Sequence, residues 1–158
     1  MRNKLSSHLL KGLIALFILI SIFITTYIIP IIVYQSKESF PELEHLALPL
    51  QIGAQLMMIM FIFGLILILY LLFLFDKGQV FSIQFTRVLN IISILCFIAS
   101  IGCVAFFMVL IPYGGPGPGG FFVIPLILAI VILGLGLALF ANVINQAIEY
   151  KSENDLTV

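Results

Sequence analysis

The stretch that decides the fold lies between Arg87 and Glu149, where residues 88–148 read VLNIISILCFIASIGCVAFFMVLIPYGGPGPGGFFVIPLILAIVILGLGLALFANVINQAI. It contains no Asp, Glu, Lys or Arg, and its apolar character is interrupted only by the Gly- and Pro-rich patch at residues 113–120. The hydrocarbon core of a bilayer is about 30 Å thick and takes about 20 apolar residues of helix. The stretch is therefore predicted to cross a membrane twice, with an external turn between the crossings.

The composition excludes an ordinary water-soluble domain. Hydrophobic residues make up 63% of the chain and charged residues 9%, against about 45–50% and 25% in soluble proteins. Seven basic residues balance seven acidic ones, so no strongly basic surface is available for nucleic acid. We expect contact with a lipid bilayer and no direct nucleic acid binding.

The whole chain, residues 1–158, is predicted to be one membrane domain with an all-α fold, an integral membrane four-helix bundle. Pro30 lies near the end of the first apolar run, where a kink costs least, and Pro49 suits the first turn of the second. The predicted helices cover about residues 11–34, 49–75, 88–111 and 121–148.

The distribution of basic residues predicts the orientation. Six of the seven fall on one side of the four predicted spans, and only Lys37 falls on the other: the six are Arg2, Lys4, Lys11, Lys77, Arg87 and Lys151. Lys and Arg are enriched in cytoplasmic loops. Both termini, the inner loop 76–87 and the tail 149–158 are therefore expected in the cytoplasm, and the loops 35–48 and 112–120 outside.

Polar side chains within the predicted helices form two one-sided groups, with members three or four residues apart. They are Gln51 and Gln55 in the second helix, and Asn142, Asn145 and Gln146 in the fourth. Such residues commonly hydrogen-bond between helices, and lining a transport path is the alternative.

Small residues spaced four apart, Gly134 with Ala138 and Ala99 with Cys103, favour close packing of the last two helices. The same spacing could serve a homo-oligomer.

No catalytic or metal-binding pattern is evident. His8 and His45 are predicted on opposite sides of the membrane, and Glu42 and Glu44 beside His45 do not by themselves define a metal site. Cys96 and Cys103 fit small apolar residues on one helix face. We predict no enzyme, no cofactor and no metal.

The inner loop carries helix-end signals. Gly78 can end the second helix and Ser82 can cap the third. One set of apolar residues then recurs at helical spacing, while Gln84 and Arg87 face elsewhere, which predicts a turn lying along the membrane interface. The set is Phe81, Phe85, Val88, Leu89 and Ile92.

Two short segments resemble a known family: Lys77-Gly78-x-x-Phe81-Ser82 in the inner loop and the closing Glu153-Asn154-Asp155-Leu156-Thr157-Val158. They are similar to the bacterial four-helix membrane proteins of the domain of unknown function 2975 family. The resemblance implies a multi-pass protein of the bacterial inner membrane without established activity, often encoded beside a small helix-turn-helix transcription regulator. The chain departs from the family pattern at Ile83-Gln84-Phe85-Thr86, where similar proteins tend to have an acidic residue and Asn before basic residues.

These segments lead to a functional hypothesis. We expect a non-enzymatic accessory protein or sensor that engages a cytoplasmic partner such as a helix-turn-helix transcription regulator. The alternative is a small channel, carrier or immunity or resistance factor against a membrane-active agent. The candidate partner-docking residues are Gly78, Phe81, Ser82, Arg87, Glu153, Asn154, Asp155 and Leu156.

Overall fold

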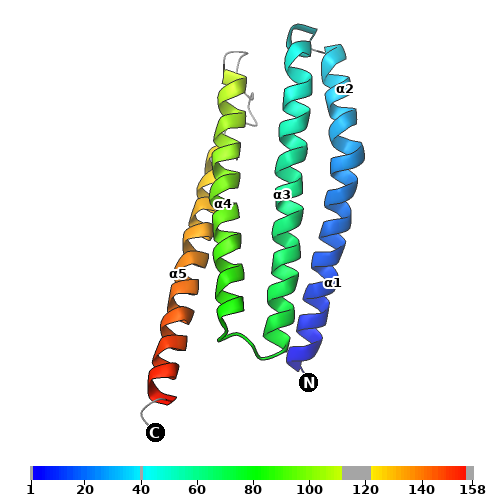
Figure 1. The fold of residues 1–158 in the computed structure, drawn as a ribbon. Helices are drawn as coiled ribbons and strands as arrows, with labels where there is room; N and C mark the ends of the chain where they lie inside the picture. The colour runs from blue at the N-terminus through cyan, green and yellow to red at the C-terminus, as the bar shows by residue number, and fades with distance from the viewer. Residues whose placement is uncertain (1, 40, 112–121, 156–158) are drawn as a thin grey trace. The chain divides into compact units, whose positions relative to one another are not determined.

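A computed structural model describes residues 2–39, 41–111 and 122–155, and this part of the chain is helical apart from one short loop, with no strand (Figure 1). Four helical spans in it are long and apolar enough to cross a membrane: Ser7–Ser39, Glu44–Asp76, Ile83–Leu110 and Val123–Lys151. The predicted all-α fold with four membrane-spanning helices is thereby confirmed. The chain divides into two compact units, Met1–Ile66 and Leu67–Val158.

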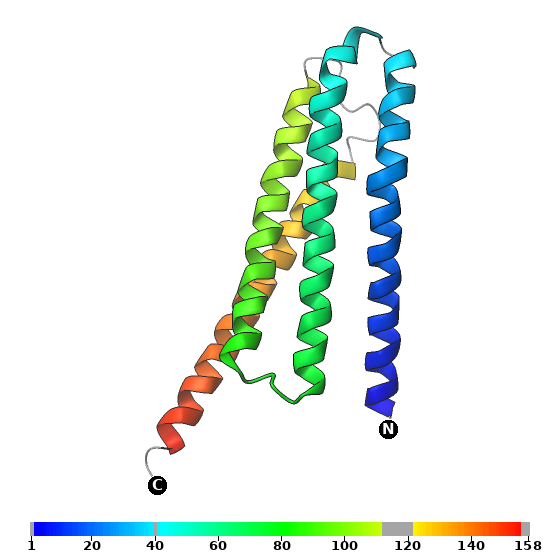
Figure 2. The same cartoon turned by 45° about the vertical axis from the view of Figure 1, so that its right-hand side comes forward.

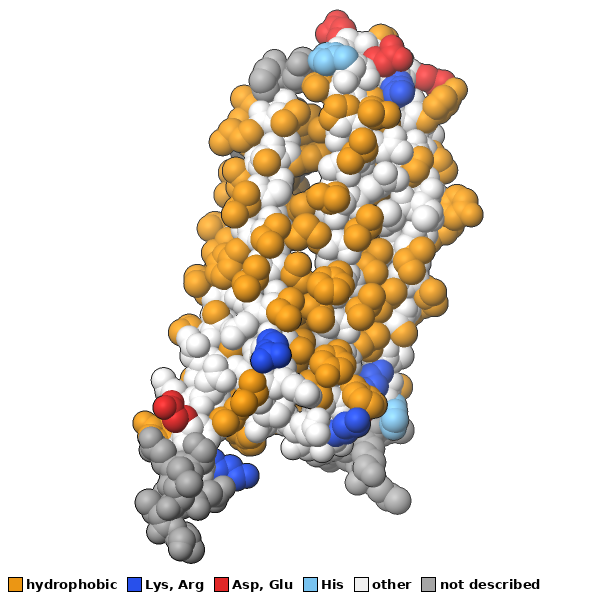
Figure 3. All heavy atoms as spheres, in the orientation of Figure 1, with side chains coloured by type: hydrophobic (Ala, Val, Ile, Leu, Met, Phe, Trp, Pro, Cys, Tyr) orange, Lys and Arg blue, Asp and Glu red, His pale blue; other side chains and the backbone are white. Residues whose placement is uncertain are grey.

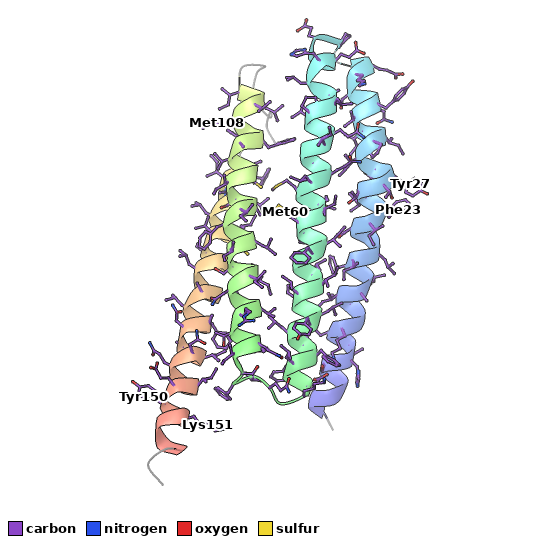
Figure 4. All side chains as sticks on the ribbon, viewed as in Figure 1. Phe23, Tyr27, Met60, Met108, Tyr150 and Lys151 are labelled. Carbon is purple, nitrogen blue, oxygen red and sulfur yellow. The ribbon has the colours of Figure 1, made fainter. Side chains whose placement is uncertain are left out.

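The first unit begins with one unbroken helical run made of α1 (Arg2–Phe23), the π-helical turn η1 (Ile24–Ile28) and α2 (Ile29–Ser39). A short 3-10 turn, η2 (Pro41–Leu43), leads into α3 (Glu44–Asp76), which continues into the second unit. On the first run, the rings of Phe23 and Tyr27 lie together with their centroids 5.3 Å apart (Figure 4).

The π turn lies directly before Pro30. A proline inside an α-helix has no N–H to donate, and its ring clashes with the carbonyl four residues earlier, here that of Thr26. In η1 the backbone N–H of Ile29 bonds instead to the carbonyl of Ile24, five residues back. The wider turn accommodates Pro30 without breaking the helix, as π-helical and side-chain adjustments do in other membrane helices.

The second unit contains the end of α3 and the antiparallel pair α4 (Ile83–Leu110) and α5 (Val123–Asp155) (Figures 1 and 2). The pair approaches closely at Gly134, where an added Cβ would lie 3.0 Å from the Cβ of Cys96. At the same level the hydroxyl of Ser93 donates a buried hydrogen bond of 2.8 Å to the Gly134 carbonyl. The predicted close packing of the last two helices is confirmed at Gly134.

A buried apolar cluster joins the three helices of this unit at one end. Its members are Leu74, Phe85, Leu89, Ala141 and Ile144, and Leu71, Val80, Leu137 and Ile148 pack against it. The beginning of α4 thus packs on the second half of α5. Consequently the α3–α4 loop and the end of α5 lie at the same end of the unit.

The helix bounds differ from the predicted ones. The first run extends through residues 2–39 rather than 11–34, and α3 begins at Glu44 rather than 49, because the turn η2 feeds directly into it. Pro49 therefore lies inside α3, still within its first two turns. The loop predicted at 35–48 is largely helical, and the loop predicted at 112–120 lies outside the described residues.

At the other end of the spans, α4 begins at Ile83 rather than 88, which shortens the predicted loop 76–87 to residues 77–82. The fourth helix, predicted to end at 148, continues to Asp155 because residues 149–155 contain neither Gly nor Pro to stop it. The segment that the sequence analysis treats as a tail is thus helical over most of its length.

Few side chains of the apolar spans are buried inside the protein. At most 17% of the most apolar window of any span is buried inside the protein. Hydrophobic side chains cover the length of the helices, and the charged ones gather near the helix ends (Figure 3). This distribution is what a lipid environment requires.

The close approach at Gly134 generates a prediction with a matched control. We expect Gly134→Ala to destabilise the protein by about 1–3 kcal/mol, because the new methyl group overpacks against Cys96. Gly136→Ala should be neutral or stabilising by up to about 1 kcal/mol, since nothing lies within 4 Å of its added Cβ. Unfolding of each purified variant by SDS in mixed micelles measures the change in its free energy of unfolding. Equal changes for the two substitutions would contradict the close packing at Gly134.

Candidate functional site

The α3–α4 loop starts with a helix stop at Gly78. Its φ of 72° lies in the left-handed region that favours glycine. The Gly78 N–H bonds to the carbonyl of Phe75 at 2.9 Å, and the Gln79 N–H bonds to that of Leu74 at 3.0 Å. This pair of bonds is the Schellman motif, which satisfies two of the last carbonyls of α3. The predicted role of Gly78 is confirmed.

Ser82 closes the loop on the other side as the N-cap of α4. Its backbone is extended, with φ −127° and ψ 149°, and its hydroxyl accepts a hydrogen bond from the Phe85 N–H at 3.2 Å. The same hydroxyl donates to the carbonyl of Gln79 at 2.7 Å. The Thr86 hydroxyl donates to the Ser82 carbonyl at 3.1 Å. The predicted cap is confirmed, and one hydroxyl bridges the loop and the helix.

Apolar residues of the loop face in two directions. Val80 packs against the buried cluster, and Phe85, Val88, Leu89 and Ile92, which recur at helical spacing, are buried. Phe81 has the same spacing but precedes the helix, and its side chain is 66% exposed. Ile83 is 65% exposed beside it.

Two basic residues flank these exposed side chains. Arg87 is exposed on the first turns of α4, as is Gln84, which confirms the predicted separation of the two faces. Lys77 follows α3, and its Nζ lies 4.3 Å from the centroid of the Phe73 ring, one turn back along that helix. This distance is within the range of a cation–π interaction.

The end of α5 carries the second group of candidate residues. Glu149, Tyr150 and Lys151 are exposed, and Figure 4 shows Tyr150 and Lys151 near the end of the helix. The backbone of Glu153, Asn154 and Asp155 continues the helix, whereas Leu156 lies outside the described residues. In both ribbon views α5 extends past the level at which α4 begins (Figures 1 and 2).

Of the polar pair on α3, Gln55 makes a specific contact. Its Nε2 donates a 3.3 Å hydrogen bond to the carbonyl of Thr25, which belongs to the π turn. Gln51, one turn earlier, is half-buried. The contact from Gln55 supports the interhelical role over the lining of a path, since a carbonyl in a widened turn requires a donor.

The polar group on α5 behaves differently. Asn142, Asn145 and Gln146 are all exposed, while their neighbours Ala141 and Ile144 face the buried cluster. The structure therefore does not bring these amides together with the polar residues of α4. Sequence reasoning missed a polar contact that joins α4 and α5 within the described residues, the hydrogen bond from the Ser93 hydroxyl to the Gly134 carbonyl.

Within the described residues, no group of three or more His, Cys, Asp or Glu side chains could hold a metal ion. Cys96 and Cys103 are free and half-buried on α4. At one end of the second unit, the α3–α4 loop and the end of α5 present exposed apolar, basic and acidic side chains.

Comparison with known proteins gives a family but no activity. A family model described as protein of unknown function (DUF2975) matches residues 31–158. The chain therefore belongs to the DUF2975 family, and the match covers α3, α4 and α5 but not α1 or η1. No curated protein and no solved structure matches the chain.

The capped loop generates the second prediction. We expect Ser82→Ala to reduce the free energy of unfolding by about 1 kcal/mol, because the Phe85 N–H loses its capping acceptor. Ser36→Ala is the control, since the exposed Ser36 hydroxyl bonds to the Ile32 carbonyl of its own helix, α2, and it should be close to neutral. Unfolding in SDS-containing mixed micelles, followed by circular dichroism, compares them. An unchanged free energy of unfolding for Ser82→Ala would contradict the capping role of Ser82.

Proposed function

We propose that this protein is a multi-pass protein of the bacterial cytoplasmic membrane that holds a cytoplasmic partner on the helical end of α5. The observation that carries the proposal is the continuation of α5 as helix through Asp155, beyond its last residue packed on the buried cluster, Ile148. The proposed partner is a helix-turn-helix transcription regulator. The proposal assigns the protein no catalytic reaction.

The length and charge of this helical end suit protein docking. Residues 149–155 add about 10 Å of helix at 1.5 Å per residue. Over residues 149–158 three acids, Glu149, Glu153 and Asp155, stand against the single base Lys151, so the net charge is 1 − 3 = −2. A segment whose backbone is already helical loses less conformational entropy on binding than a flexible one would.

The charge sign selects the kind of partner. A helix-turn-helix regulator reads DNA with a surface rich in Lys and Arg, because DNA presents a dense row of phosphates. An acidic helix complements such a surface and would compete with DNA for it. Bound in this way, the regulator would be held at the membrane and released when the complex dissociates.

The orientation that the proposal needs is supported by two independent features. Six of the seven basic residues lie on the predicted cytoplasmic side. The buried cluster, moreover, brings the α3–α4 loop and the end of α5 to the same end of the second unit.

The transport or resistance alternative lacks a comparable observation. Gln55 already bonds to the Thr25 carbonyl, and Asn142, Asn145 and Gln146 do not meet a polar face of α4. Accordingly, the docking function is the one that the described geometry favours.

The orientation has its own test in a Cys96→Ala/Cys103→Ala background, which removes both native thiols. We expect a single cysteine introduced by Lys37→Cys to react with a membrane-impermeant maleimide on intact cells. A single cysteine introduced by Lys151→Cys should react only after the membrane is opened. Labelling at position 151 in intact cells would reverse the orientation and exclude a cytoplasmic partner there.

The docking function is tested by charge reversal at the end of α5. We expect Glu153→Lys/Asp155→Lys to reduce co-purification of a co-expressed helix-turn-helix regulator at least tenfold, because the double substitution changes the net charge of the tail by four. Glu38→Lys/Glu42→Lys makes the same change in the predicted outer loop and should leave recovery unchanged. Equal recovery with both double variants would refute docking through this acidic end.

A further inference from the structure

We propose that the α3–α4 loop is an interfacial anchor that binds the headgroups of anionic phospholipids, with Phe81 and Ile83 inserted and Lys77 and Arg87 on the phosphates. This anchor is independent of the acidic end of α5, so either assignment can fail without the other. It removes Phe81 and Arg87 from the residues expected to dock a protein partner.

The exposure of Phe81 is a fixed feature of the fold. The loop is held at Gly78 by the Schellman bonds and at Ser82 by the cap, and the Ser82 hydroxyl also binds the Gln79 carbonyl. Val80 is turned into the buried cluster. The next side chain in the chain, Phe81, is left 66% exposed.

The position of Phe81 and Ile83 along the membrane normal places them at the membrane interface. Arg87 is the charged residue that ends the apolar stretch of α4, and Ile83 lies about 6 Å beyond it at 1.5 Å per residue. The headgroup region adds about 5–7 Å to each side of the hydrocarbon core. Phe81 and Ile83 are therefore expected among the headgroups, where a large apolar side chain needs partial cover from lipid.

Charge identifies the lipid. Lys77 and Arg87 outnumber the one acid of the segment, Asp76, so residues 76–87 carry a net charge of 2 − 1 = +1. The Lys77 ammonium lies over the ring of Phe73, which belongs to the α3 span, so it is directed back toward the bilayer. Basic side chains near an anionic leaflet attract its headgroups, while their stems cover apolar surface.

The same charges argue against the alternative occupant. A DNA-binding regulator has a basic surface, which Lys77 and Arg87 would repel and the acidic end of α5 would attract. Exposed aromatic and aliphatic side chains beside basic ones are typical of segments that lie in a membrane interface. The loop and the end of α5 are therefore assigned different partners.

The chain contains no tryptophan, so Phe81→Trp provides a single fluorescent reporter. The full-length variant is placed in nanodiscs that mix phosphatidylcholine and phosphatidylglycerol, with either lipid brominated. We expect blue-shifted emission and stronger quenching when the phosphatidylglycerol carries the bromine. Lys77→Gln/Arg87→Gln should abolish the preference for quenching by phosphatidylglycerol. Each basic residue near a charged leaflet enriches anionic lipid around it about fivefold.

Two controls separate the outcomes. Lys37→Gln changes a basic residue at the other end of the spans and should preserve the preference, and Tyr150→Trp should report a water-exposed α5 end. Equal quenching by both brominated lipids would overturn the headgroup assignment. Water-like emission of the tryptophan at position 81, shifted only on addition of the regulator, would assign the loop to a protein partner instead. If the variants unfold at the same SDS concentration as the parent protein, misfolding is excluded as the cause of a lost lipid preference.

Discussion

The structure depends on one constraint: a backbone N–H or C=O left without a partner in hydrocarbon costs several kcal/mol, so every residue of a span must be in a helix or be served by another donor or acceptor. The described helices meet this constraint even where the sequence works against it. Before Pro30 the chain widens into a π turn, and the Gln55 amide donates to one of its carbonyls. Hydroxyls of Ser21, Thr25 and Thr26 bond to carbonyls of the preceding turn in the same region.

Helix association in lipid follows from the same constraint, because lipid tails are as apolar as leucine and packing must supply the attraction. The α4–α5 pair packs closely where Gly134 removes a side chain, and the Ser93 hydroxyl adds a hydrogen bond at that point. Close packing there fixes the antiparallel register of the two helices. Through the buried cluster, that register brings the α3–α4 loop and the end of α5 to one end of the unit.

This shared end has two chemically different parts. The loop offers exposed apolar side chains with Lys77 and Arg87, whereas the helical end of α5 offers acids. The division gives a physical reason to assign the loop to the membrane surface and the end of α5 to a soluble partner. The two proposals thereby assign anchoring and docking to separate parts of the same end.

Consecutive residues were enough to predict the fold class, the four spans, the helix stop at Gly78 and the cap at Ser82, because apolar length and local backbone chemistry can be read along the chain. It misplaced the helix ends, since Pro49 and the polar residues 149–155 are tolerated within helices once neighbouring turns are formed. The exposure of Phe81, the pairing of Ser93 with Gly134 and the contact from Gln55 to Thr25 were decided only by tertiary structure. The two hydrogen bonds depend on which helix faces meet across a long separation in sequence, and no local pattern encodes that meeting. The exposure of Phe81 depends on the packing of Val80 against the buried cluster.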